Sequence, residues 1–179
     1  MEAKDCIKTR RSVRKFKDTP IDIDLVKELV ETASYSPSWK HSQIARYYAV
    51  TGDLKDKVAV DATHAYPHNG EIIKEAPLLM VVTFVKNRSG FERDGSFSTN
   101  KETGWQYFDA GISTQSFTLA AWDKGLGTVI MGIFDDAVVA SLLDIPETEE
   151  VGCLIPVGFP DETPVAPRRK DVNDLLTIK

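Results

Sequence analysis

No stretch of this sequence has the run of about 20 apolar residues that a helix needs to cross a bilayer. The longest apolar run, "APLLMVVTFV", is about half that length, and the first residues contain no apolar core of a signal peptide. Cysteine is also scarce, because Cys6 and Cys153 are the only two and lie far apart. Without secretory features, such a pair indicates buried free thiols. We therefore expect a cytoplasmic protein with no membrane segment and no disulfide.

Basic residues are too few in total to suggest a nucleic-acid partner. The chain has 22 Lys and Arg against 27 Asp and Glu, a formal net charge of −5, whereas nucleic-acid-binding domains usually have a broad basic excess. The sequence also lacks the Gly-x-Ser-x-Gly turn of serine hydrolases. Neither of the two glycine-rich phosphate-binding loops is present, because the chain contains no GxGxxG turn of dinucleotide folds and no GxxxxGK[ST] loop. Any phosphate must therefore be held by side chains.

The composition is that of one folded domain. The 179 residues are 42% hydrophobic and 27% charged, which is ordinary for a single globular domain with a sizeable core. No internal repeat or linker divides the chain. We expect residues 1–179 to form a single domain.

Helix and strand patterns alternate along the chain. Apolar residues at helical spacing follow Asp22 as an N-cap, and a run of about six turns, apolar on most faces, ends at Gly125. The expected strands are residues 45–51, 78–85, 126–134 and 151–159. The expected shorter helices are residues 54–65, 71–76 and 135–143, and residues 86–103 are expected to form a long loop. Such a pattern is typical of a layered α+β or α/β domain.

Two basic clusters stand at opposite ends of this acidic chain. Their residues, with one serine among them, are Arg10, Arg11, Ser12, Arg14, Arg168, Arg169 and Lys170. The planar guanidinium of arginine suits phosphate through paired hydrogen bonds, and a serine hydroxyl adds a donor. The clusters therefore suggest one shared anion, such as the terminal phosphate of a nucleotide or flavin. Alternatively, both clusters are solvated surface charges.

Seven segments in order resemble the nitroreductase family and together cover nearly the whole chain. They are "RRSVRKF", the helix after it, "SPSWKHSQ", "EIIKEAPLLMVV", the long segment from "DAGISTQSF" to "LLDIPE", "LIPVGFP" and "PRRK". The resemblance implies an α+β, nitroreductase-like fold with a central, mostly antiparallel β-sheet flanked by helices. It also implies an intertwined homodimer that binds FMN at two interfacial sites.

The resemblance assigns cofactor-binding residues in three groups. The group for the FMN phosphate and ribityl chain is Arg10, Arg11, Ser12, Arg14, Arg168 and Arg169. The group on a turn that reaches the flavin of the other subunit is Pro37, Ser38, Trp39 and His41. The group at a strand end beside the isoalloxazine ring is Met131 and Gly132.

The chain departs from the family pattern near that turn. His41 stands where the family usually has Asn, and a neutral imidazole offers one donor and one acceptor on a differently shaped ring. His41 is therefore either a flavin or substrate contact or an ordinary surface histidine. Phe91, Phe97 and Trp105 lie in or beside the loop of residues 86–103, and they either roof the substrate pocket or serve in ordinary lid or interface packing.

The activity implied by the resemblance is a ping-pong oxidation of NADH or NADPH with a nitroaromatic, quinone or enone as acceptor. The flavin carries such chemistry, so no catalytic acid or base is named. Two alternatives stay open: a non-catalytic flavin-binding, storage or sensing protein of the same fold, and an anion-binding scaffold without flavin. His64 and His68 lack a third metal ligand at a recognisable spacing, so no metal is expected.

Overall fold

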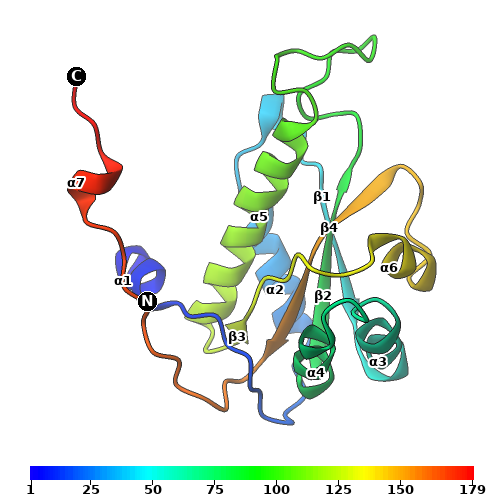
Figure 1. The fold of residues 1–179 in the computed structure, drawn as a ribbon, viewed down its shortest axis with the longest axis vertical. Helices are drawn as coiled ribbons and strands as arrows, with labels where there is room; N and C mark the ends of the chain where they lie inside the picture. The colour runs from blue at the N-terminus through cyan, green and yellow to red at the C-terminus, as the bar shows by residue number, and fades with distance from the viewer.

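A four-stranded antiparallel sheet forms the centre of the molecule. The computed structural model describes residues 1–179 and orders the strands β1 (Ala45–Val50), β2 (Leu78–Val85), β4 (Glu149–Gly158) and β3 (Gly127–Thr128), as Figure 1 shows. All three neighbouring pairs are antiparallel. The expected α+β fold with a central antiparallel sheet is confirmed.

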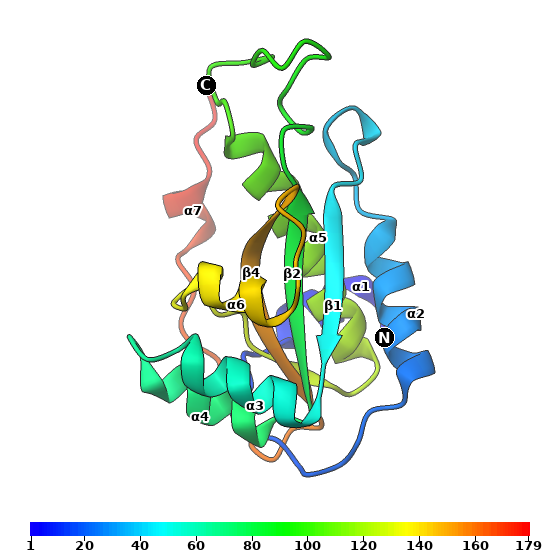
Figure 2. The ribbon, with the colours of Figure 1, turned by 90° about the vertical axis from the view of Figure 1, so that its right-hand side faces the viewer.

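Five of the helices cover the two faces of this sheet. The helices of the chain are α1 (Ala3–Thr9), α2 (Ile23–Ser34), α3 (Gly52–Asp61), α4 (Pro67–Glu75), α5 (Gly104–Asp123), α6 (Asp136–Leu142) and α7 (Val172–Leu175). Figures 1 and 2 show α2 and α5 on one face and α3, α4 and α6 on the other. None of the helices combines the length and apolar character required to span a membrane.

The continuous apolar run of β2 explains how both faces are packed. Successive side chains of a strand point to opposite faces, so Leu78 and Met80 join the core under α2 and α5, while Leu79 joins the core under α3, α4 and α6. On the helix side, Asp22 caps α2 by accepting from the Asp24 N–H, and Leu29 is buried. The strand covered on both faces and the capped helix are therefore confirmed.

Residues 126–134 form much less strand than the sequence predicts. Only Gly127 and Thr128 pair with β4, and further along the same register Met131 and Leu154 exchange two hydrogen bonds of 2.8 and 3.1 Å. Pro156 of β4 lies between these two pairings and has no N–H to donate, so the ladder is interrupted there. The expected long strand is wrong for this physical reason. Helix α1, in contrast, was not expected.

Other expectations concern cysteines, histidines and the long loop. Cys6 and Cys153 are buried and free, which confirms the prediction of unpaired thiols. Residues 86–103 contain neither helix nor strand and extend beyond the N-terminal end of α5 (Figure 1). Helix α3 ends at Asp61 and α4 begins at Pro67, so His64 and His68 do not lie on one helix. No group of three or more His, Cys, Asp or Glu side chains is close enough to hold a metal ion.

Candidate functional site

Arginines from both ends of the chain line one hollow of about 220 Å³. Its lining residues are Arg10, Arg11, Ser12, Arg14, Pro164, Val165, Pro167 and Arg169. The structure therefore brings together five of the six residues expected around the phosphate. Arg168 does not line the hollow, although it is adjacent to Arg169 in sequence.

The N-terminal part of the hollow is fixed against the edge of the sheet. Ser12 bridges to Thr128 of β3, and the Val13 N–H donates to the Thr128 carbonyl at 3.0 Å. The Val13 side chain is fully buried and lies so close to Gly127 that a Cβ there would be 2.7 Å from it. A glycine at 127 therefore allows the "RRSV" segment to approach the strand closely.

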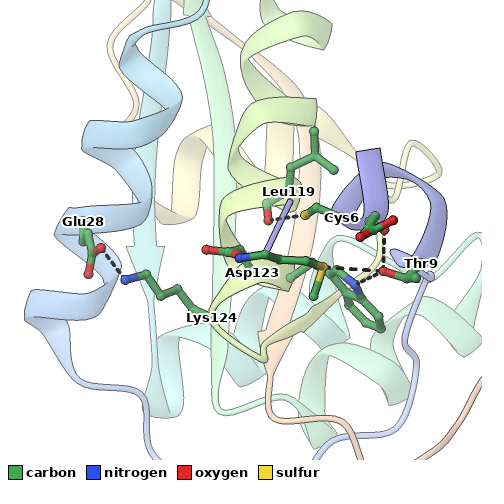
Figure 3. Close-up of polar contacts among 9 residues, drawn as sticks. Cys6, Thr9, Glu28, Leu119, Asp123 and Lys124 are labelled. Atoms are coloured by element: carbon green, nitrogen blue, oxygen red, sulfur yellow. Dashed lines mark hydrogen bonds and ion pairs between the residues drawn. The ribbon is translucent and has the colours of Figure 1, made fainter. Parts of the chain in front are cut away.

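Helix α1, which leads into this segment, is anchored on the end of α5 (Figure 3). The Cys6 thiol donates to the Leu119 carbonyl at 3.3 Å, and the amino group of Met1 pairs with Asp123 at 2.6 Å. The indole N–H of Trp122 donates to the Thr9 hydroxyl at 3.0 Å. These contacts fix the backbone immediately before Arg10.

A second set of backbone contacts places the C-terminal segment of the hollow beside the N-terminal segment. The Lys17 N–H donates to the Phe159 carbonyl and the Asp161 N–H to the Lys15 carbonyl, both at 2.9 Å. The Glu162 carboxylate then accepts from the N–H groups of Arg14 and Lys15 at 2.5 and 3.2 Å. The tail that carries Arg169 therefore starts from a fixed point beside the N-terminal arginines.

Positive charge in this hollow is not neutralised by the protein. None of its arginines forms an ion pair with a carboxylate, and Arg11 donates instead to the carbonyls of Lys8 and Arg10. Burial, and then the neighbouring charges of Arg11 and Arg169, hold the pKa of Arg10 below its usual value. Half-buried Arg10 and Arg11, with exposed Arg169 and a serine hydroxyl beside them, form a donor set that suits a phosphate.

The second expected group lies on a strained turn between α2 and β1. Residues 39–41 form a short 3-10 helix, and Lys40, His41 and Gln43 have positive φ angles of 45°, 56° and 47°. Such left-handed conformations cost a non-glycine residue roughly 1–3 kcal/mol each. His41 is exposed and its Nε2 lies 2.5 Å from the Gln43 side-chain amide. Pro37 and Ser38 line a separate cavity of about 290 Å³.

Asp109 of α5 joins this turn to the long loop. Its side chain is 4% exposed, and its Oδ2 accepts from the Trp39 N–H at 2.9 Å, from the Ser42 hydroxyl at 3.3 Å and from the Ser89 hydroxyl at 2.6 Å. A second link is the ion pair of 2.9 Å between Lys40 and Glu92. Sequence reasoning missed Asp109, although it is one of only two charged residues inside the helix of residues 104–123.

Aromatic rings occupy the space between the turn and the loop. Trp39 lies against Trp105 with 4.6 Å between ring centroids, and Phe91 packs on Phe97 at 4.9 Å. The indole N–H of Trp39 is buried without a hydrogen-bond partner. Phe91 and Phe97 therefore pack within the loop, whereas Trp105 of α5 packs on Trp39 of the turn.

The third expected group lies after the short strand β3. Met131 is buried and bonded to Leu154 through its backbone, whereas Gly132 is exposed. In the single chain, neither residue lines the arginine hollow or the cavity beside the turn. The three groups of expected cofactor-binding residues therefore do not line a common cavity in the single chain.

Comparisons with known proteins agree with this fold. Residues 7–159 match the Nitroreductase family. A Methanothermobacter thermautotrophicus protein named "Putative NADH dehydrogenase/NAD(P)H nitroreductase" is 29% identical over 92% of this chain and 80% of its own. A nitroreductase family protein from Clostridium novyi has a TM-score of 0.77 and 29% identity over 97% of this chain and 91% of its own. Iodotyrosine deiodinase, solved with FMN and 3-iodo-L-tyrosine, has a TM-score of 0.78 and 22% identity over 94% and 95%.

Proposed function

Because the chain belongs to the nitroreductase family, we propose that it is an FMN-dependent oxidoreductase that takes electrons from NADH or NADPH and delivers them to a nitroaromatic, quinone or enone. The relative from Methanothermobacter thermautotrophicus carries an NAD(P)H nitroreductase name, and the iodotyrosine deiodinase structure holds FMN. The single observation from this chain that carries the proposal is the arginine hollow.

The donor set of the hollow fits the phosphate of FMN. Arg10, Arg11 and Arg169 are unpaired with carboxylates, Ser12 supplies a hydroxyl, and the lining includes no acidic side chain. Burial, and then repulsion by Arg11 and Arg169, lowers the pKa of Arg10, and a phosphate dianion would offset both effects. In this proposal these residues bind the phosphate, while Met131 and Gly132 present backbone groups to the ring.

The bound flavin would accept a hydride from the nicotinamide and pass electrons to the acceptor in alternating, ping-pong fashion. The residues of the protein would then bind the flavin, orient its ring and shield it from water. Pro37, Ser38, Trp39 and His41 would face the ring from the turn, and the exposed imidazole of His41 could donate a hydrogen bond to the ring edge or to an acceptor. Phe91 and Phe97 would restrict access of water from the long loop.

We further propose that two chains share each site in a homodimer. Tyr107 and Phe108 of α5 are 53% and 59% exposed and line one surface hollow together with Ile112. Large apolar side chains that lie together at a surface favour a protein interface. Since the turn and the arginine hollow are separate in one chain, a partner would supply the turn to the other chain's flavin. Sedimentation showing a monomer that retains flavin would contradict this arrangement.

The proposed function is tested on the purified protein. Its visible absorbance spectrum, followed by heat release and identification of the chromophore against FMN, FAD and riboflavin, should give FMN. Steady-state oxidation of NADH and NADPH with a nitroaromatic or quinone acceptor should then show turnover. Bound FMN without turnover would favour a flavin-binding protein of the same fold, and a colourless protein that takes up no FMN would refute the proposal.

A further inference from the structure

The turn of residues 37–43 adopts a conformation that its own sequence does not favour. Lys40, His41 and Gln43 all have positive φ angles, and none of the three is a glycine, the residue that adopts such angles without steric cost. The turn also leaves the Trp39 indole N–H buried and unpartnered. Local strain of this kind persists only where the surrounding structure imposes it.

Within the turn, the Gln43 N–H donates to the Ser38 hydroxyl at 3.0 Å, and the buried group that ties the turn to the rest of the molecule is the carboxylate of Asp109. One oxygen, Oδ2, accepts three hydrogen bonds, two of them from Trp39 and Ser42 within the turn and the third from Ser89 in the long loop. No Lys, Arg or His forms an ion pair with this carboxylate. A buried carboxylate without an ion-pair partner is stable only while it keeps its hydrogen-bond donors. These hydrogen bonds therefore hold the turn and the long loop in fixed positions relative to each other.

A weaker, exposed contact supports the same register. Lys40 pairs with Glu92, which also accepts from the Ser98 hydroxyl at 2.6 Å. These hydrogen bonds, first from Ser98 and then from Lys40, hold the pKa of Glu92 below its usual value. Because both charges of this pair are largely exposed, it contributes little by itself, and Asp109 is the determining contact.

We propose that Asp109 is a positioning residue for the flavin site: it holds the turn of residues 37–43 in the strained form that presents Pro37, Ser38, Trp39 and His41 to the flavin ring. This inference rests on the proposed function. Asp109 need not touch the flavin, because it acts through the backbone of Trp39. The turn serves the ring and the arginine hollow serves the phosphate, so the two parts can be separated experimentally.

The test compares the affinities of the full-length protein for FMN and for riboflavin, which lacks the phosphate. In Asp109→Asn, an isosteric change, both dissociation constants should rise by the same factor, on the order of tenfold, so that their ratio stays at the wild-type value. Ser89→Ala, which removes one of the three donors, should give a smaller rise in both. Thr114→Val removes a hydroxyl from another buried position of α5 that does not touch the turn, and serves as the matched control.

A readout without flavin accompanies the titrations. Trypsin should cut after Lys40 faster in apo Asp109→Asn than in apo wild type, because release of the carboxylate frees the turn. Unchanged affinities and an unchanged cleavage rate would overturn the role of Asp109, as would a loss of FMN affinity alone. A wild-type protein that binds neither FMN nor riboflavin would instead refute the proposed function.

Discussion

The arginine hollow makes a prediction about two adjacent residues with the same charge. Arg169 lines the hollow with Arg10 and Arg11, whereas Arg168 does not. Arg169→Ala and Arg168→Ala therefore make identical changes in composition and net charge at neighbouring positions. Only the first is expected to affect binding of a phosphate in the hollow.

The size of the effect follows from the environment of Arg169. A hydrogen bond to a charged group contributes about 1.5–3 kcal/mol, which corresponds to roughly 10- to 150-fold in a dissociation constant. Arg169 is exposed to solvent, which places its contribution at the lower end. We expect Arg169→Ala to weaken FMN binding about tenfold and to leave riboflavin binding unchanged.

Arg169→Ala should weaken FMN binding without lowering the thermal stability of the protein that has no ligand bound. Burial is the main cause that lowers the pKa of Arg10, and the charges of Arg11 and then Arg169 add to it, so Arg169 repels Arg10 in the folded protein. Removing one cation relieves this repulsion, so the melting temperature of the apoprotein should not fall. Destabilisation of the apoprotein together with equal losses for FMN and riboflavin would indicate a merely structural arginine.

The assay is a titration of flavin fluorescence for each variant, paired with thermal unfolding with and without FMN. The reasoning is refuted if Arg169→Ala binds FMN as tightly as the wild type. It is also refuted if Arg168→Ala and Arg169→Ala lose the same affinity, since a diffuse surface field would then explain both.

Two further predictions concern groups outside this hollow. The buried ammonium of Lys55 donates to the carbonyls of Ile73 and Lys74 at the end of α4, both at 2.9 Å. Lys55→Met should therefore lower the free energy of unfolding by about 1–3 kcal/mol for each carbonyl that loses its donor. An unchanged midpoint of unfolding in urea would contradict this. The hydrogen bond to Glu150, followed by partial burial, raises the pKa of Tyr107 to about 12 from its ordinary 10.0. Because the pKa of Tyr107 is higher in the folded than in the unfolded protein, the stability that this group contributes is fully present below the unfolded pKa and is lost as pH rises towards the folded pKa. A tyrosinate absorbance titration should show this high-pH step in the wild type and not in Tyr107→Phe.

The parts of the fold that the sequence predicts are those with a local cause. Asp22 can accept from the N–H groups at the start of α2 whatever the rest of the chain does. Gly125, with a φ of 78°, ends the long helix because glycine adopts that angle freely. The run of β2 is apolar on both sides, and it is found between two helical layers.

The parts that the sequence does not predict are decided by distant partners. Residues 126–134 have strand composition, but Pro156 of the neighbouring strand removes the donor that would continue the pairing. Positive φ angles are unusual for Lys40 and Gln43 and less so for a histidine, and the turn that contains them is bonded to a carboxylate 67 and 70 positions away. Likewise, two adjacent arginines are indistinguishable in sequence, and only the path of the tail separates Arg169 from Arg168.

The two halves of the proposed site are therefore held by different kinds of interaction. The hollow depends on several contacts, which include backbone hydrogen bonds of Val13, Lys17 and Asp161 and the carboxylate of Glu162. The turn depends chiefly on the single carboxylate of Asp109. Substitutions around the turn should consequently weaken contacts to the flavin ring and leave contacts to the phosphate in place, because the hollow shares no lining residue with the cavity beside the turn. In the proposed site, binding of the ring and binding of the phosphate can therefore be altered separately.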